Sequence, residues 1–375
     1  MRIDQITLFI VRLPLVRPFA TSSSAKDHLN HILVRACAGD LVGWGECACP
    51  SDPYYCEETT ETCWHIVRDF IAPAVLHRDW DDIETLIGYY RRVKRNNFAK
   101  AGLEIAAWDL LAQERGQPLH RLLGGTRSEI LSGVSLGIEP DLSRLFALVD
   151  EYVAEGYRRF KLKIGPGRDV ETIRQVRQRY PDLPLMADAN SAYTLADLPT
   201  LQALDAFDLL MIEQPLAHDD IVDHAHLQRQ LRTPLCLDES ILSAADARKA
   251  LDLGSCQIIN IKVSRLGGLL EARRVHDLCA ERGVPVWCGG MHEYGIGRAA
   301  NVALASLPGF AIPGDVSGSD KYYLQDLVDP PIVASRGAIP VPNTAGLGYA
   351  PVEERIRRHT TRSLDITARG AYHGY

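Results

Sequence analysis

The stretch Leu183-Pro-Leu-Met-Ala-Asp188 sets the pattern for the fold, because it is a short apolar run that ends in a charged residue. Similar runs end at Lys163, Glu213, Asp238 and Lys262. Successive members of this set are 25, 25, 25 and 24 positions apart, about the length of one strand-plus-helix unit. A charge at the same point of five successive units indicates that all five side chains project toward one end of a barrel.

Strand-like runs alternate with amphipathic helical patterns from about residue 130 onward. The helical patterns include residues 142–155, 169–180 and 269–282. The strand-like runs are Ser132–Ile138, Arg159–Ile164, Leu183–Ala189, Leu209–Gln214, Leu235–Ser240, Gln257–Val263, Val284–Gly289 and Ala311–Val316. Eight strands with intervening helices favour an α/β fold, a (β/α)7β-type TIM barrel, over a doubly wound sheet. No glycine-rich phosphate-binding motif follows the first strand, which disfavours nucleotide binding.

The region before the barrel has the pattern of an α+β domain that caps it. Ile3–Leu13 and His31–Ala38 carry strand-like apolar residues, and Val42–Glu46 follows a turn at Gly39-Asp40. Helical patterns cover 58–80, 82–95 and 99–114. We therefore expect a capping domain at 1–125, a catalytic barrel at 126–320, and a C-terminal segment at 321–375 that packs back on the capping domain.

Composition narrows the class of protein. The formal net charge of −7 argues against nucleic acid as a partner. No signal peptide or membrane span is visible, so we expect a cytoplasmic protein. Four of the nine cysteines, Cys47, Cys49, Cys56 and Cys63, lie close together in the sequence near His65, but without the paired spacing of a zinc site. We expect these four to be free thiols.

The charged residues at the strand ends predict a metal site. Three carboxylates at one barrel mouth, Asp188, Glu213 and Asp238, repel one another unless a cation joins them. Oxygen ligands suit Mg²⁺, with Mn²⁺ as an alternative, and the lack of His or Cys in the set disfavours zinc. Such an ion holds a substrate carboxylate and neutralises the charge that develops when the adjacent carbon loses its proton.

The lysines predict acid–base chemistry. Lysine is a poor base at its usual pKa of about 10.4, but a metal ion and a second ammonium group should lower that pKa. Lys161 supplies the second ammonium group, because residues two apart on a strand share a face. Lys163 and Lys262 should approach the substrate from opposite sides. This arrangement permits racemisation, and it also permits elimination.

At this point the residues resemble the enolase superfamily, within its muconate-lactonizing-enzyme group. Lys bases acting with Mg²⁺ are a known feature of such sites. The matching elements at the strand ends are Lys161-Leu-Lys163, Asp188-Ala-Asn190, Glu213-Gln-Pro215, Asp238-Glu-Ser240 and Lys262. Four further segments are similar to the branch of N-succinylamino acid racemases and o-succinylbenzoate synthases: Ser132–Gly137, Trp287–Met291, Gly295–Asn301 and Pro313–Asp315.

The resemblance implies roles for individual residues. Asp188, Glu213 and Asp238 would hold Mg²⁺, and Lys163 and Lys262 would be the acid–base pair, with Lys161 tuning Lys163. Substrate contacts or supporting contacts would come from Ser135, Asn190, Glu239, Gly289, Gly290, Met291 and His292. The resemblance also implies a small-molecule carboxylate substrate, a homo-oligomer, and a loop near Leu15–Asn30 that closes over the barrel mouth. The Thr21–Ser24 run in that segment is equally typical of a plain surface loop.

Two departures and several rival functions stay open. After Met291 this branch usually has an aliphatic residue, then Glu, then a small hydroxyl residue, whereas here the order is His292-Glu293-Tyr294. We expect both larger polar residues where the substrate's side group lies, which weakens the assignment of a succinyl-type substrate. Dipeptide epimerases carry Asp-x-Asp where this chain has Asp315-Val-Ser317, which favours an N-acylated or amine-free substrate. A muconate-type cycloisomerase and a non-enzymatic metal-binding barrel are the remaining alternatives.

Overall fold

A computed structural model describes residues 1–20, 25–139 and 141–367. Its N-terminal part contains an antiparallel sheet with the strand order β15-β1-β2-β3. The strands are β1 (Gln5–Ala20), β2 (Ala25–Ala38), β3 (Leu41–Cys47) and β15 (Thr360–Ile366). The turn between β2 and β3 uses Gly39 at a φ of +57°, a backbone conformation that glycine adopts without steric cost. The predicted loop near Leu15–Asn30 is wrong for most of its length, because residues 15–20 continue β1 and residues 25–30 begin β2. The Thr21–Ser24 run within it lies outside the described residues.

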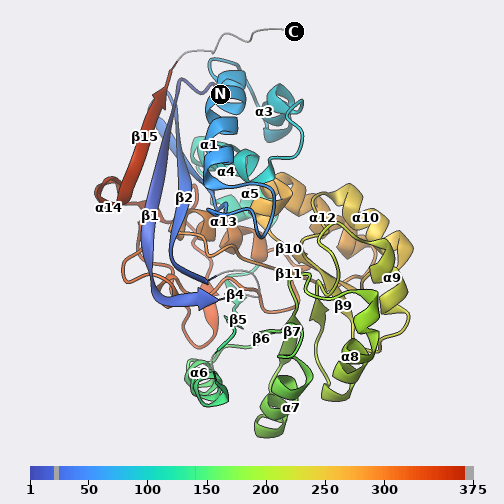
Figure 1. Ribbon diagram of the computed structural model, residues 1–375. Helices are drawn as coiled ribbons and strands as arrows, with labels where there is room; N and C mark the ends of the chain where they lie inside the picture. The colour runs from blue at the N-terminus through green and yellow to red at the C-terminus, as the bar shows by residue number, and fades with distance from the viewer. Residues whose placement is uncertain (21–24, 140, 368–375) are drawn as a thin grey trace.

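Helices pack against one face of this sheet (Figure 1). They are α1 (Thr60–Ile66), α2 (Ala72–Val75), α3 (Ile83–Tyr90), α4 (Asn97–Glu114) and α5 (Leu119–Leu123). The predicted continuous helix at 58–80 is wrong, because a π-helical segment at Val67–Ile71 separates α1 from α2 and the second helix ends at Val75. Pro73 explains the interruption, since proline lacks the N–H group that an α-helical hydrogen bond needs at this point.

Glycines allow α4 to lie directly on β3. A Cβ atom added to Gly45 would be 2.0 Å from the carbonyl oxygen of Gly102 on α4. A Cβ atom added to Gly43 would be 2.2 Å from the carbonyl oxygen of Ala106, one turn later. Most of α4 is therefore buried, in agreement with its predicted apolar character.

The second part of the chain is a barrel of parallel strands. Its order is β11-β10-β9-β8-β7-β6-β5. The strands are β5 (Val134–Leu136), β6 (Phe160–Lys163), β7 (Leu185–Asp188), β8 (Ile212–Glu213), β9 (Leu235–Leu237), β10 (Ile258–Ile261) and β11 (Val286–Cys288). The helices between and after them are α6 (Leu142–Ala154), α7 (Val170–Arg179), α8 (Leu198–Ala203), α9 (Val222–Gln228), α10 (Ala244–Leu253), α11 (Val263–Leu266), α12 (Leu269–Glu281) and α13 (Gly295–Ala305).

Seven of the eight predicted barrel strands are present, but the eighth, Ala311–Val316, is not a regular strand. The segment nevertheless lies between the first and last strands of the sheet. Gly314 bridges to Ser132 beside β5, and Phe310 bridges to Val286 on β11. Pro313 explains the irregularity, because it cannot donate the hydrogen bond that a central strand requires. The predicted (β/α) barrel class is confirmed.

The C-terminal segment returns to the capping domain. It contains β12 (Val328–Asp329), β13 (Ala338–Pro340), β14 (Ala350–Pro351) and α14 (Glu353–His359). β13 pairs with β4 (Glu129–Leu131), and β15 then lies antiparallel beside β1. Figure 1 shows this contact as a red strand beside a blue one.

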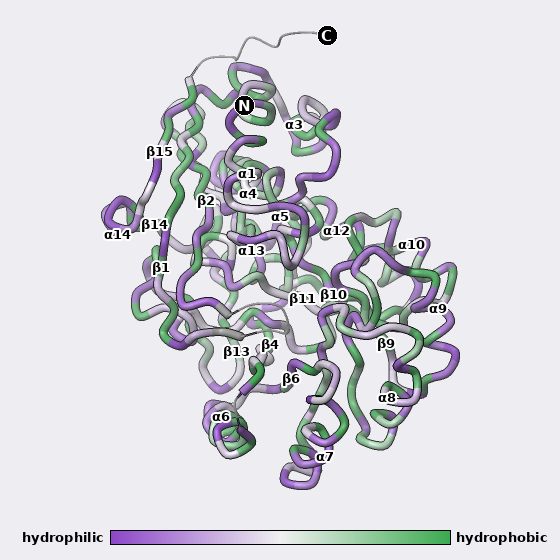
Figure 2. Tube along the Cα trace, viewed as in Figure 1, coloured by the Kyte–Doolittle hydropathy of each residue, from purple (hydrophilic) through white to green (hydrophobic). Residues whose placement is uncertain are grey.

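The outer helices of the barrel are amphipathic, with one face toward the core and the other toward water. In Figure 2 helices such as α10 carry both hydrophilic and hydrophobic colours. The buried residues of α10 include Ala247 and Ala250, three positions apart on one face. In the part of the chain that the structure describes, we find no helix with the length and apolar character needed to cross a bilayer.

Candidate active site

The barrel brings the five charged residues of the repeated pattern to the same end. Lys163, Asp188 and Glu213 are the last residues of β6, β7 and β8, and neighbouring strands pair them directly, Lys163 with Asp188 and Asp188 with Glu213. Asp238 follows β9 immediately, and Lys262 follows β10. The three carboxylates are therefore flanked by a lysine on each side along the sheet.

The first lysine belongs to a chain of polar contacts. Lys163 Nζ lies 2.6 Å from Asp188 Oδ2 and donates to Asn190 Oδ1 at 2.5 Å. Asn190 Nδ2 donates in turn to Glu239 Oε1 at 3.1 Å. Asn190 and Glu239, both expected as supports, thus hold Lys163 in a fixed orientation. The other oxygen of Glu239 is buried and has no hydrogen-bond partner among the described residues.

Lys161 lies among three carboxylates beneath the cavity. Its Nζ is 3.1 Å from Glu213 Oε2 and 3.2 Å from Asp188 Oδ2. The shortest contact, 2.6 Å, is to Asp315 Oδ2, a residue to which the sequence assigned no role at this centre. Arg159 holds the other oxygen of Asp315 at 2.6 Å. Both positive charges at Asp315 are almost fully buried, so this carboxylate is neutralised within the protein.

Lys262 contacts residues that sequence reasoning missed. Its Nζ lies 2.8 Å from Asp238 Oδ2 and donates to the hydroxyl oxygen of Tyr55, a capping-domain residue, at 3.1 Å. The Tyr55 hydroxyl also donates to Asp238 Oδ1 at 3.3 Å. Arg265 forms an ion pair with the same carboxylate. Sequence reasoning also missed Asn260, which lies in β10 two positions before Lys262. Its Nδ2 donates to Glu213 Oε1 at 2.6 Å.

The buried charged groups of the site shift one another's pKa values. Burial raises the pKa of Glu213, and the charge of Asp188 raises it further. Burial lowers the pKa of Lys262, but nearby Tyr55, Glu239 and Glu213 outweigh it and the net pKa is raised. The lowering that we expected for the site lysines depends on a bound metal ion. In the structure the carboxylates surround the ammonium groups and stabilise their charge.

The donor set fits a hard divalent cation. Asp188, Glu213 and Asp238 lie at the ends of adjacent strands and are each at most 1% exposed. Their side chains offer only oxygen atoms, the donors that Mg²⁺ prefers. Among the described residues no three His, Cys, Asp or Glu side chains converge as a ready-made ligand set, and lysine ammonium groups contact these carboxylates.

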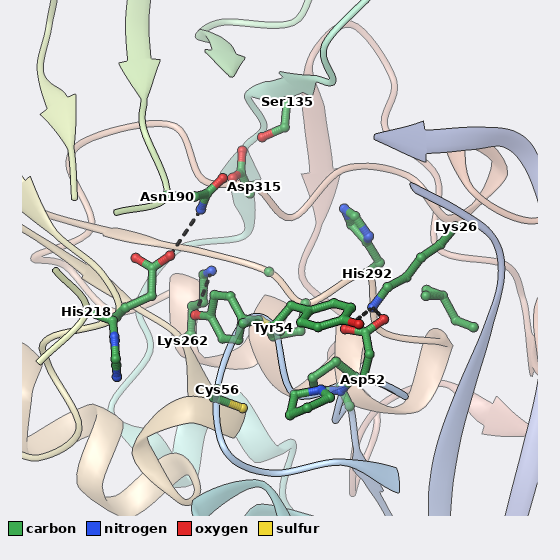
Figure 3. Close-up of a pocket in the computed structure, with 18 of the residues that line it drawn as sticks. Lys26, Asp52, Tyr54, Cys56, Ser135, Asn190, His218, Lys262, His292 and Asp315 are labelled. Carbon is green, nitrogen blue, oxygen red and sulfur yellow. Dashed lines mark hydrogen bonds and ion pairs between the residues drawn. The ribbon is translucent and has the colours of Figure 1, made fainter. Parts of the chain in front are cut away.

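A cavity of about 440 Å³ lies above the lysines, between barrel and capping domain. Figure 3 shows Ser135, Asn190, Lys262 and Asp315 around it. Of the residues we expected at the site, Lys161, Lys163, Lys262, Ser135, Asn190, Glu239, Gly290, Met291 and His292 line it. Gly289 and the three carboxylate residues Asp188, Glu213 and Asp238 are not among the residues of its wall. A Cβ atom added to Gly289 would lie 2.2 Å from Asn260 Oδ1 and 2.8 Å from Lys262 Cγ, so glycine at this position allows Lys262 to pack closely.

His292 and Tyr294 do not share a location. His292 lines the cavity, and its ring lies tilted against that of Tyr322, with the ring centres 4.7 Å apart. The expectation that Tyr294 lies beside the substrate is wrong: its side chain is fully buried and donates to the backbone oxygens of Val11 and Leu29 in the capping sheet. The large ring at this position therefore joins the two parts of the chain, and it leaves the cavity unobstructed.

Comparison with protein families follows the same division of the chain. Residues 5–124 match the N-terminal domain of the mandelate racemase / muconate lactonizing enzyme family, and residues 144–355 match the enolase C-terminal domain-like family.

The chain belongs to the mandelate racemase / muconate lactonizing enzyme family.

The predicted resemblance to enolase-superfamily enzymes is thereby confirmed. Similar proteins include one named o-succinylbenzoate synthase from Geobacillus kaustophilus, 52% identical, with 96% of each chain covered. An N-succinylamino acid racemase from an Amycolatopsis species is 46% identical, covering 98% of this chain and all of the relative. A crystal structure of an enolase-superfamily member from Listeria innocua superposes with a TM-score of 0.94 at 37% identity, covering 98% of this chain and 99% of that one. Enzymes of this superfamily use a divalent metal ion.

Proposed function

We propose that this enzyme removes the proton on the carbon beside a carboxylate, and so racemises N-acyl amino acids, N-succinyl ones in particular, or dehydrates the cyclohexadiene precursor of o-succinylbenzoate. The carrying observation is the arrangement of Lys163 and Lys262, which flank three buried carboxylates and both line the same cavity. The names of the relatives support both reactions.

The two lysines account for both reactions. In racemisation the neutral Nζ of one lysine takes the α-proton from one face, and the protonated Nζ of the other returns a proton to the opposite face. In dehydration one lysine takes the α-proton and then gives it to the leaving hydroxyl, which departs as water, while the ammonium group of the second lysine stabilises the negative charge. Racemisation needs the lysines on opposite sides of the reacting carbon, and the same arrangement permits dehydration.

We propose Mg²⁺ as the ion, with Mn²⁺ as an alternative, held by Asp188, Glu213 and Asp238. A bound divalent ion supplies positive charge that holds the substrate carboxylate and lowers the pKa of nearby ammonium groups. Asn190 and Glu239 keep Lys163 oriented. Ser135 belongs to the wall of the cavity, and its hydroxyl group has no hydrogen-bond partner among the described residues.

The contacts of Asp315 help to distinguish a dipeptide substrate from an N-acylated amino acid. A dipeptide carries a free ammonium group that needs an available carboxylate. Asp315 lines the cavity, but Arg159 and Lys161 already hold both of its oxygens. Position 317, where dipeptide epimerases carry a second aspartate, is a buried serine. An N-acylated substrate is therefore favoured over a dipeptide.

Incubation with N-succinyl and N-acetyl amino acids in D₂O tests the proposal. Deuterium at the α-carbon together with loss of optical rotation would support racemisation, and conversion of the cyclohexadiene precursor would support dehydration. Activity on muconate-type lactones but on neither of these substrate sets would overturn the assignment to this branch.

Three further features complete the proposal. We retain the division into a capping domain (1–125), a barrel (126–320) and a C-terminal segment (321–375), supported by the pairing of β15 with β1. We also propose a homo-oligomer in the cytoplasm. Light scattering of the purified protein and fractionation of the source cells test these two points.

A further inference from the structure

The capping-domain side of the cavity carries polar groups at the end remote from the lysine pair. Leu15 and Leu29 make part of this wall apolar, but Lys26, His31 and Asp52 line it as well. In Figure 3 Lys26 and Asp52 lie together, away from Asn190. A site for an aliphatic or aromatic side group would be lined mainly by apolar residues here.

His31 is held rigidly with one ring nitrogen directed away from the cavity. It is 1% exposed, and its Nδ1 lies 2.7 Å from Glu46 Oε1. Glu46 also accepts the backbone N–H groups of Tyr294 at 2.9 Å and Gly297 at 2.8 Å, at the start of α13. A carboxylate with these contacts requires Nδ1 of His31 to donate, which fixes the tautomer and the orientation of the ring.

The second ring nitrogen of His31 is available to a ligand. Nε2 has no hydrogen bond to any described residue, and it is not among the fully buried polar atoms that lack a partner. With Nδ1 bonded to Glu46, Nε2 is the ring nitrogen left for a further hydrogen bond. His31 lines the cavity, so Nε2 is the ring nitrogen left for a hydrogen bond with a ligand there.

The charges of this wall are balanced internally. Lys26 Nζ lies 3.2 Å from Asp52 Oδ2, with each side chain about one quarter exposed. His31 has Glu46 as its partner. Burial, assisted by Lys321 and Arg298, holds the pKa of His292 well below its ordinary value, so this imidazole is neutral. Glu57 lies exposed at the rim, where water screens its charge.

We propose that this wall selects a substrate whose side group is neutral and hydrogen-bonding, such as the carboxamide of an N-acyl glutamine, with His31 as the principal contact. The inference rests on the proposed racemase function. A charged side group would lose water here without gaining a counter-ion, because Lys26 and Asp52 already neutralise each other. An apolar side group would leave Nε2 of His31 dry and unpaired. A carboxamide both donates and accepts hydrogen bonds, and it carries no charge.

Four N-succinyl amino acids of similar length separate these possibilities: the derivatives of glutamine, methionine, glutamate and lysine. With added Mg²⁺, we expect kcat/KM for the glutamine derivative to exceed each of the others by about tenfold or more. A methionine derivative that matches or exceeds it would overturn the inference while leaving the racemase function intact. If none of the four were racemised, the proposed function would fail and this inference with it.

Variants of the wall test the mechanism of selection. His31→Leu should reduce the ratio of kcat/KM for glutamine over methionine by about tenfold, whereas the same change at the exposed His65 should not alter it. Since His31→Leu also removes a partner of Glu46, a second pair of variants avoids the buried core. Asp52→Asn leaves Lys26 unpaired and should shift preference toward the glutamate derivative, and Lys26→Gln should shift it toward the lysine derivative. If neither variant changed its substrate preference, the Lys26–Asp52 pair would have no part in excluding charged side groups.

Discussion

The hydroxyl group of Tyr55, from the capping domain, lies 3.1 Å from Nζ of Lys262 at the end of the sixth strand of the barrel. The ammonium group also lies 4.8 Å from the centre of the Tyr55 ring. The capping domain thus supplies one of the groups that set the charge state of the lysine. The barrel strands alone do not complete the site.

Tyr55→Phe should shift the pH dependence of the reaction. Tyr55 raises the pKa of Lys262, so its hydroxyl group favours the charged ammonium. Without it, the pKa falls and the neutral amine is present at lower pH. We expect the acidic limb of the kcat profile to move to lower pH for the enantiomer from which Lys262 takes the proton. Tyr349→Phe removes a hydroxyl bonded to the oxygen of Pro340 and is the matched control; an equal shift in both variants would exclude the contact as its cause.

Asp315→Asn should destabilise the fold strongly. The change leaves the buried charges of Arg159 and Lys161 without a partner that contacts both, and loss of one member of a buried ion pair costs about 3–5 kcal/mol. Asp150→Asn removes the exposed pair with Arg179 and alters the exposed hydrogen bond from the Tyr180 hydroxyl, for which we expect about 1 kcal/mol or less. Urea denaturation measures both. Similar free energies of unfolding for the two variants would show that Asp315 has little structural role.

Glu104 should make stability fall as pH rises toward neutrality. Its carboxylate accepts from the backbone N–H groups of Leu269 and Leu270 and from Trp108, yet burial raises its pKa to about 7. An acid with a higher pKa in the folded state stabilises the fold fully below its unfolded pKa of about 4.5, and this contribution is lost as pH rises through 7. The rise in pKa from about 4.5 to about 7 corresponds to a contribution of about 3 kcal/mol to the free energy of unfolding.

The comparison of wild type with Glu104→Gln isolates this effect. Between pH 5 and pH 8 the free energy of unfolding of the wild type should fall relative to that of the variant. Glu114→Gln, at the exposed end of the same helix, should show no such pH-dependent difference. A constant difference between wild type and Glu104→Gln across this range would show that the carboxyl group keeps one protonation state.

Metal binding should depend on the three strand-end carboxylates. We expect Mg²⁺ to raise the melting temperature and EDTA to abolish α-proton exchange. Asn substitutions at Asp188 and Asp238 should each weaken binding of Mn²⁺, measured by its electron paramagnetic resonance signal, by tenfold or more. Asp150→Asn is the control. Wild-type Mn²⁺ affinity in both site variants would remove these residues from the ligand set.

The contacts made along single strands could be predicted from the sequence, because a residue's place at a strand end fixes where its side chain projects. This is why Lys163 and Asp188, 25 positions apart, meet as expected. The signal for Asn260 was also present, since it alternates with Lys262 in β10. Alternation along β10 places its side chain inside the barrel.

Contacts between the capping domain and the barrel could not be predicted in this way. Tyr55 and Lys262 are 207 positions apart, and no local pattern relates them. Tyr294 shows the same limit: its position after β11 suggested a cavity residue, but its ring turns into the capping sheet. The side-chain direction in an irregular segment depends on packing that is decided elsewhere in the chain.

The central claim is that two lysines act on opposite faces of one α-carbon, and exchange in D₂O from each enantiomer of an N-succinyl amino acid tests it most directly. For Lys163→Ala and Lys262→Ala we expect racemisation to fall by at least about 100-fold. Each variant should still exchange the α-proton of one enantiomer only, the opposite one in the two variants, while Lys249→Ala on the exposed face of α10 behaves as wild type. Exchange of both enantiomers at the wild-type rate in Lys163→Ala or Lys262→Ala would contradict the account.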